Sequence, residues 1–223
     1  MAPGSRVLRL LGGLVATVLV ATSLTPGGAA AEGSQTNYVQ RLRLQAQLQT
    51  LNSDLLSHDS ATAVLQGLCD RRDPAAPRIL ARQVQVPDDL AAANAARRQL
   101  GAAANEPVHR RRVELTCGEV VLSRADNWYL PGRLTAQMNT DLASTQRPFG
   151  VVVRPLNFQR RTLSSRLLFQ PLPAGWEAAD PADLDAPVSV PANVLQHRAY
   201  LQTPDGRPFA LLIETYSDRV LIP

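Results

Sequence analysis

Lysine is absent from this chain of 223 residues, and all 23 of its basic residues are arginine. Such a bias suits a GC-rich genome at least as well as it suits any function. Aromatic residues are also few, at 4% of the chain. The arginines are scattered, and no stretch combines a basic stripe with aromatic rings that could stack on bases. In spite of the net charge of +4, we therefore expect no nucleic-acid binding.

Cysteine and histidine are scarce as well. The two cysteines and three histidines do not show the ligand spacing of a zinc site. The sequence also lacks a glycine-rich phosphate loop and the H-E-x-x-H and G-x-S-x-G motifs. We therefore expect no metal and no cofactor.

Long apolar runs are missing except at the N-terminus. Arg6 and Arg9 form a positive segment, residues 10–24 form an apolar core, and residues 29–31 fit an A-x-A cleavage site. The run is shorter than the roughly 20 residues that a membrane span needs. We expect a signal peptide at residues 1–31, export from the cytoplasm, and no stable membrane span after cleavage. An uncleaved anchor is the alternative.

Export bears on Cys69 and Cys117, which are the only cysteines. An oxidising compartment favours a disulfide between them. Two buried free thiols are the alternative.

The remaining chain, residues 32–223, has the composition of one globular domain, because 45% of the whole sequence is apolar and only 19% is charged. Periodicity, caps and turn signals predict secondary structure along it. The expected helices are at residues 38–56, 61–69, 88–101 and 134–142. The expected strands are a hairpin at 110–131, segments at 151–156 and 158–171, a hairpin at 195–202 and 207–217, and a strand at 78–86. Residues 172–190, rich in proline and acids, are expected to form an exposed loop. Together these elements predict an α+β fold with an antiparallel sheet.

Two charged residues interrupt strand patterns. Arg112 lies in mid-strand, opposite the apolar face of the first hairpin, and is either a solvated arginine or an anion ligand; the strand alone favours the first. Glu214 interrupts a strand that is apolar on both faces. A buried carboxylate needs a partner, so Glu214 either forms a salt bridge or faces a polar cavity.

Segments along the chain resemble the chorismate lyase family, whose members split chorismate into 4-hydroxybenzoate and pyruvate. Residues 55–62, L-L-S-H-D-S-A-T, are similar to that family's L-L-x-x-D-S-x-T turn. Residues 112–117 through Pro131 are similar to its R-x-x-L-x-C…V-P hairpin, and residues 148–150 to the P-L-G turn that follows. Residues 205–214 are similar to its S-G-K-P…T-E strand.

The resemblance implies a six-stranded antiparallel sheet with flanking helices and a ligand buried under helical flaps. It makes Arg112 the carboxylate-binding arginine and Glu214 the carboxylate near the hydroxyl or ether end, so we expect this catalytic pair to face one cavity and together to decide ligand binding. Phe149 and Gly150 would line the pocket, with Phe149 where the family usually has leucine. Arg198 is a candidate for a second carboxylate. Ala61 stands where a flap methionine is expected, which makes the pocket looser.

The implied activity is elimination of pyruvate from chorismate, with a small aromatic or enolpyruvyl carboxylate as ligand. Holding the dianion and placing one acid or base would suffice. Chorismate is a cytoplasmic metabolite, however, and the expected export argues for a second reading. In that reading the chain is a non-enzymatic binding module for aromatic carboxylates on the same fold. A secreted interaction protein with a vestigial pocket is a third reading. The sequence does not determine the oligomeric state.

Overall fold

The computed structural model describes residues 29–72, 75, 77–184 and 186–221, with side chains from Asn37 onward. The expected apolar core of the signal peptide, residues 10–24, lies outside this part of the chain. Helix α1 (Ala29–Ser57) begins at the expected cleavage site and is longer than the predicted helix at 38–56. Cleavage after Ala31 would remove the first residues of this helix.

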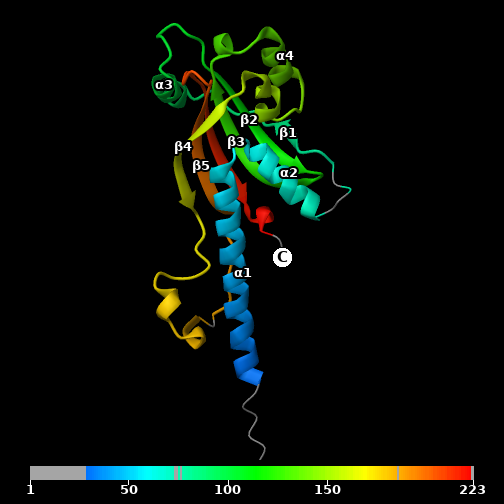
Figure 1. The fold of residues 1–223 in the computed structure, drawn as a ribbon, viewed down its shortest axis with the longest axis vertical. Helices are drawn as coiled ribbons and strands as arrows, with labels where there is room; N and C mark the ends of the chain where they lie inside the picture. Colours follow the sequence, from blue (N-terminus) through cyan, green and yellow to red (C-terminus); the bar gives the residue numbers. More distant parts are fainter. Residues whose placement is uncertain (1–28, 73–74, 76, 185, 222–223) are drawn as a thin grey trace, which may run out of the picture.

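One antiparallel sheet of six strands forms the centre of the molecule, as expected (Figure 1). Its spatial order is β1-β2-β3-β6-β5-β4. The strands are β1 (Leu80–Gln83), β2 (His109–Cys117), β3 (Val120–Tyr129), β4 (Gln159–Leu167), β5 (Asn193–Gln202) and β6 (Pro208–Ser217). The strand that carries Glu214 is therefore interior, which agrees with the apolar character of both its faces.

Helices cover both faces of the sheet. The main core packs α1 and α2 (Ala61–Arg72) against the sheet through Leu48, Leu55 and Leu65. On the opposite face, α3 (Leu90–Gln99) buries Ala96 against Trp128 and Leu211. The short helices α4 (Ala136–Ser144) and α5 (Phe149–Val152) form a third cluster with β6. The fold is α+β, and the helices lie on both faces of the sheet.

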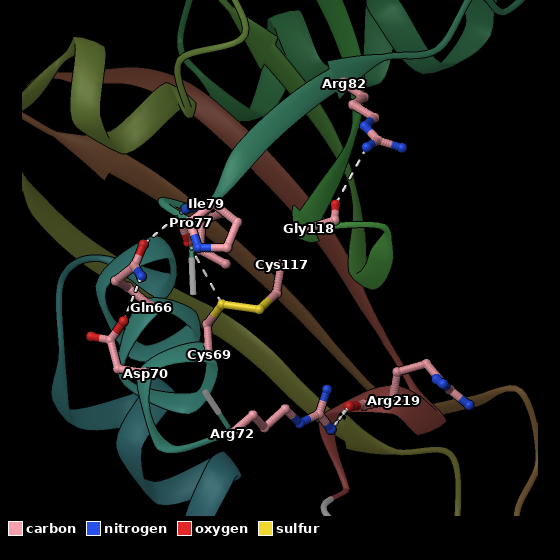
Figure 2. The surroundings of a disulfide bond; sticks show 10 residues. All are labelled: Gln66, Cys69, Asp70, Arg72, Pro77, Ile79, Arg82, Cys117, Gly118 and Arg219. Carbon is pink, nitrogen blue, oxygen red and sulfur yellow. Dashed lines mark hydrogen bonds between the residues drawn. A yellow bond between two sulfur atoms is a disulfide. The ribbon is translucent and has the colours of Figure 1, made fainter. Parts of the chain in front are cut away.

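A disulfide joins Cys69 of α2 to Cys117 at the end of β2, so the expected pairing is confirmed (Figure 2). Gln66 stabilises the same region, because its side chain accepts a hydrogen bond from the Ile79 backbone and donates one to Asp70. The C-terminal half of α2 is thus fixed to the sheet.

The strand predicted at residues 151–156 is wrong. This segment forms α5 and the 3-10 turn η2 (Arg154–Leu156). The apolar residues that suggested a strand are instead two successive buried valines, Val152 and Val153, which pack into the α4 and α5 cluster. Pro155 lies at the start of η2, where a proline without an N–H is tolerated.

The predicted loop at residues 172–190 contains two 3-10 turns, η3 (Trp176–Ala178) and η4 (Pro181–Leu184). It extends beside the N-terminal half of α1, past the end of the sheet (Figure 1). Arg41 of α1 holds it, donating hydrogen bonds to the carbonyls of Pro171 and Ala186. The remaining 3-10 turns are η1 (Pro131–Arg133) and η5 (Asp218–Val220).

Candidate functional site

A small pocket lies between the sheet and the N-terminal turn of α2, with α5 closing one side. We call it the inner pocket. The sheet contributes Val113, Ala125, Asn127, Arg160, Leu212 and Glu214, and the cover contributes Asp59, Ser60, Ala61, Thr62, Phe149 and Gly150. Its volume of about 30 Å³ holds about one water molecule. In this conformation it is closed to a ligand of the size of hydroxybenzoate.

An ion pair forms the polar floor of the inner pocket. The Arg160 Nη2 of β4 lies 2.6 Å from the Glu214 Oε2 of β6. Their side chains are only 3% and 7% exposed. The Tyr216 hydroxyl donates a second hydrogen bond to the same carboxylate oxygen, at 3.2 Å. Glu214 therefore forms a salt bridge and also faces a polar pocket, so the two alternatives for its buried charge both apply.

The electrostatics follow from burial and from this pair. Burial by itself lowers the pKa of Arg160, but the charge of Glu214 and the hydrogen bond to it outweigh burial and raise that pKa. Burial, and then the charge of Glu214, raise the pKa of the Tyr216 hydroxyl well above its usual range. Arg160 is charged and Tyr216 is neutral at physiological pH.

The Arg160 guanidinium is not fully hydrogen-bonded. Among the described residues, its buried Nε finds no hydrogen-bond partner. An unpaired buried N–H costs free energy, about 1–3 kcal/mol in typical proteins. A water or a ligand oxygen in the inner pocket would satisfy it.

A polar chain continues behind the ion pair. His197 of β5 is fully buried, and its Nε2 lies 2.8 Å from the Asn52 Oδ1 of α1. The Ser165 hydroxyl donates to the same oxygen at 2.7 Å. Because a carbonyl oxygen only accepts, His197 carries its proton on Nε2. Burial, and then the charge of Arg160, lower the pKa of His197 to about 4.

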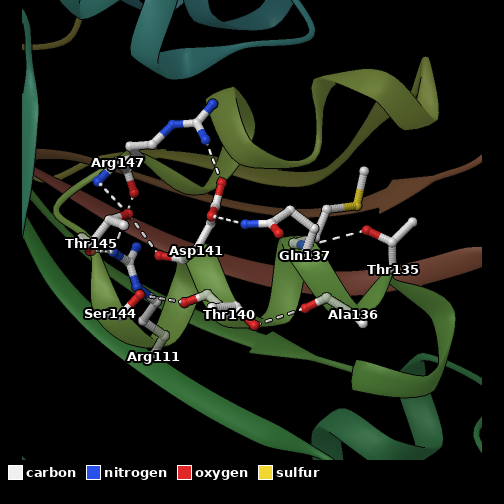
Figure 3. A network of polar contacts seen from close by, with 10 residues as sticks. Arg111, Thr135, Ala136, Gln137, Thr140, Asp141, Ser144, Thr145 and Arg147 are labelled. Carbon is white, nitrogen blue, oxygen red and sulfur yellow. Dashed lines mark hydrogen bonds and ion pairs between the residues drawn. The ribbon is translucent and has the colours of Figure 1, made fainter.

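The position of α5, which supplies Phe149 and Gly150, is set by a buried arginine that sequence reasoning missed (Figure 3). Arg111 of β2 is 4% exposed and donates hydrogen bonds to the carbonyls of Leu142, Thr145 and Arg147. These carbonyls end α4 and lead into α5. Burial lowers the pKa of Arg111, whose charge is stabilised by main-chain carbonyl dipoles and is paired with no carboxylate among the described residues.

The structure brings together three of the candidate ligand residues, Phe149, Gly150 and Glu214, in the inner pocket. It does not bring Arg112 there, so the expectation that Arg112 and Glu214 face one cavity is wrong. Ala125 pairs with both Val113 and Glu214, so these three side chains share a face. Arg112 is one residue away from Val113 and points to the opposite face, because side chains alternate along a strand.

On that opposite face, Arg112 forms an ion pair with Asp126, whose carboxylate also binds Arg110. Arg198 lies on the same face and donates to the Gln99 side chain of α3 at 3.3 Å. In the register of β5 and β6, its neighbour along the strand, His197, lies opposite Glu214, so His197 and Glu214 share a face and Arg198 points to the other one. Arg160 occupies the position in the pocket that we had expected an arginine from β2 to fill. The sequence signal for Arg160 was weak, because it is one of three arginines in the predicted strand at 158–171.

No cluster of three or more His, Cys, Asp or Glu side chains in the described ranges could hold a metal ion. Within those ranges, no helix has the length and apolar character needed to cross a bilayer.

Comparison with known proteins supplies one clear relative. No family model matches the chain. The protein y4mC of Sinorhizobium fredii (strain NBRC 101917 / NGR234), described as uncharacterized, is 44% identical over 187 residues, which cover 82% of this chain and 78% of that protein. This chain belongs to the y4mC family. The family name carries no activity with it.

Solved structures overlap with this y4mC family member more loosely. The effector domain of PhnF from Mycobacterium smegmatis is 14% identical, with a TM-score of 0.42, and the match covers 72% of this chain and 90% of that domain. The ligand-binding domain of a GntR-family transcriptional regulator from Bordetella bronchiseptica is 19% identical, with a TM-score of 0.34, covering 62% of this chain and 80% of that one. A likeness of this degree carries no argument about the ligand.

Proposed function

We propose that this protein is an exported, non-enzymatic module that binds a small aromatic or enolpyruvyl carboxylate in the inner pocket. The observation that carries the proposal is the buried Arg160–Glu214 ion pair on the floor of a small pocket, with the Arg160 Nε lacking a partner among the described residues. Perturbed charged groups in a cavity are typical of functional sites.

The ion pair suits a particular end of the ligand. A second carboxylate beside Glu214 would be repelled in a site of low dielectric. A hydroxyl group can donate to Glu214 and accept from the Arg160 Nε, so it satisfies both partners. In the proposal, the hydroxyl end of a hydroxybenzoate-type ligand reaches the floor, Phe149 contacts the ring, and the carboxylate points outward. Arg160 thus binds the hydroxyl end, and Arg112 and Arg198, which were expected to bind carboxylates, take no part in the proposed site.

Ligand entry requires the cover to move, since the closed pocket has room for about one water. The disulfide fixes the C-terminal half of α2, and Arg111 fixes the start of α5. The N-terminal turn of α2, residues 59–62, is held to the sheet by a hydrogen bond from the Arg160 backbone N–H to the Asp59 Oδ1, at 2.8 Å, which opening would break. We propose that this turn opens.

Export is supported by the Cys69–Cys117 disulfide, because disulfides persist in oxidising compartments. The sequence of residues 6–31 supports it independently. Export also weighs against chorismate lyase activity, since the substrate is made in the cytoplasm. The resemblance to chorismate lyases remains the reason to test that activity, with Glu214 as the group near the ether oxygen.

The test measures binding and turnover on the same preparation, the oxidised chain beginning at Glu32. 4-Hydroxybenzoate at millimolar concentration should raise the melting temperature. Glu214→Gln should abolish that shift, whereas Arg112→Gln, on the opposite face of the sheet, should retain it. With chorismate as substrate, no pyruvate should appear in an assay coupled to lactate dehydrogenase.

The outcomes separate the readings. Pyruvate release that is lost in Glu214→Gln would replace the binding module with a lyase. No thermal shift with 4-hydroxybenzoate, chorismate or related acids would refute both readings of the inner pocket.

A further inference from the structure

A large groove lies directly outside the inner pocket, between α2 and the segment at residues 146–154. We call it the outer groove. Its volume is about 780 Å³, against about 30 Å³ for the inner pocket. Small-molecule sites typically measure about 300–1,000 Å³. Of these two spaces, only the outer groove therefore has the size of a ligand site, and only the inner pocket has a buried ion pair.

The two spaces share a wall. Ser60 and Thr62 line both of them. Gly150 faces Ser60 across this wall, and a Cβ added at Gly150 would lie 3.5 Å from the Ser60 Oγ and 3.8 Å from the Phe158 Cζ. The missing side chain leaves the wall thin, so a rotation of Ser60 or a small shift of the α2 N-terminal turn would join the two spaces.

The outer groove is lined by apolar residues and by exposed arginines, which we call its rim. Ile79, Leu80, Pro148 and Val151 supply apolar surface. Its charged residues are three arginines and one aspartate: Arg78, Arg147, Arg154 and Asp70. Arg147 is paired with Asp141, and Asp70 accepts a hydrogen bond from Gln66. Arg78 and Arg154 are exposed and form no ion pair with any residue that the structure describes.

We infer that the inner pocket and the outer groove form one site for an elongated hydroxy acid with an apolar body. The hydroxyl end meets Arg160 and Glu214, the apolar body lies along the groove, and the acidic end meets Arg78 and Arg154. This inference rests on the proposed function and extends it, because it names the length and polarity of the ligand. It also explains why the buried ion pair is net neutral while the rim is positive.

Calorimetric titration with a graded series of probes tests the inference: 4-hydroxybenzoate, 6-hydroxyhexanoate, 10-hydroxydecanoate and 16-hydroxyhexadecanoate, each below its critical micelle concentration. Each methylene that becomes buried in the groove should raise the affinity about fourfold, until the chain leaves the groove. The methyl ester of the best acid measures the contribution of the charge.

The arginines are tested separately. Arg78→Gln and Arg154→Gln should together lower the affinity for the long acid about tenfold or more and leave the affinity for its methyl ester unchanged. Arg166→Gln removes an exposed arginine of β4 that lines neither space and serves as the matched control. Glu214→Gln should weaken the acid and the ester alike. Gly150→Ala thickens the shared wall and should weaken every probe.

The results distinguish this inference from the proposed function. If 4-hydroxybenzoate binds through Glu214 but affinity does not rise with chain length, the inner pocket stands and the outer groove is overturned. If long acids bind and Glu214→Gln has no effect, the two spaces are not one site, and the inference is overturned. If no probe binds, both the inference and the proposed function are refuted.

Discussion

Arg160 and Glu214 show how one buried pair can be both a structural and a functional feature. Removing one partner of such a pair leaves the other as a buried, uncompensated charge, at a cost of about 3–5 kcal/mol. Removing both charges restores electrical neutrality and costs far less. The stability of single and double variants therefore reports how well the inner pocket is hydrated.

We predict that Arg160→Met destabilises the protein by about 3–5 kcal/mol, because Glu214 is then buried without its cation. Arg160→Met combined with Glu214→Gln should recover most of that loss, since the glutamine is neutral and still accepts the Tyr216 hydroxyl. Arg161→Met, at the exposed neighbouring position, should change stability by no more than about 0.5 kcal/mol. Urea unfolding measures all three. Equal losses in the single and double variants would mean that water already solvates Glu214.

His197 couples stability to pH. Its pKa is about 4 in the folded chain and about 6.5 when unfolded. Between these values the unfolded chain binds a proton that the folded chain does not, so stability falls as pH drops from about 6.5 to about 4. Below the folded pKa, this residue adds no further change. The difference of pKa corresponds to about 3 kcal/mol over the window.

Carboxylates titrate in the same pH range, so the effect of His197 has to be measured as a difference in stability between the wild-type chain and a variant that lacks this histidine. We expect the stability of the wild-type chain minus that of His197→Gln to decrease as pH is lowered through this window. Glutamine can still donate to the Asn52 side chain but does not titrate. Urea unfolding at a series of pH values gives the difference curve. A flat curve would mean that His197 has a similar pKa in the folded and unfolded chains.

At the scale of elements, α2 and α5 cover the same pocket but are held in different ways. The disulfide anchors α2 at its C-terminal half, whereas hydrogen bonds from Arg111 anchor the segment that leads into α5. The disulfide spans a sequence separation of 48 residues. On the chain-entropy model, closing a loop of that length stabilises the folded state by about 4 kcal/mol.

We predict that Cys69→Ala with Cys117→Ala lowers the free energy of unfolding by about 4 kcal/mol, because the unfolded chain loses its cross-link. The folded variant should still bind 4-hydroxybenzoate, since the N-terminal turn of α2 carries the pocket residues. Urea unfolding and calorimetry measure the two properties. Loss of binding in a variant that is still folded would show that the disulfide also sets the position of the cover.

The sequence predicted some of these elements much better than others. Helix α2, the β2–β3 hairpin and the disulfide followed from sequence signals: a helical period, strand and turn patterns within residues 110–131, and a unique cysteine pair. The strand predicted at residues 151–156 was wrong because its three successive valines, at 151–153, have strand propensity, and only tertiary packing makes them helical. Local patterns carry little information about which distant elements will pack together.

The residues of the candidate site also differed in how well the sequence predicted them. Glu214 could be recognised because it broke a pattern within its own strand. Arg160 could not, since its importance depends on β4 lying two strands away from β6, which is a property of topology. The family resemblance named Arg112 instead, although alternation along β2 already placed it opposite the apolar face.

At the scale of the whole molecule, the long helix α1 joins two regions. Its C-terminal half packs on the sheet through Leu48, Leu51 and Leu55. Its N-terminal half extends past the sheet beside residues 172–190 (Figure 1). Arg41 connects this half to the loop, and η4 lies against it. Core contacts therefore begin well after the expected cleavage site.

We predict that the chain beginning at Glu32 unfolds in one cooperative transition, because the main core spans α1, α2 and the strands from β1 to β6. Differential scanning calorimetry should give equal calorimetric and van't Hoff enthalpies. A chain beginning at Gln45 lacks Arg41 and the projecting N-terminal half of α1, but keeps Leu48, Leu51 and Leu55. It should unfold at a somewhat lower temperature, still in one transition, and residues 172–190 should become sensitive to protease. Two separate transitions in the longer chain would contradict a single domain at residues 32–223, and unchanged protease resistance in the shorter one would show that Arg41 does not hold the loop.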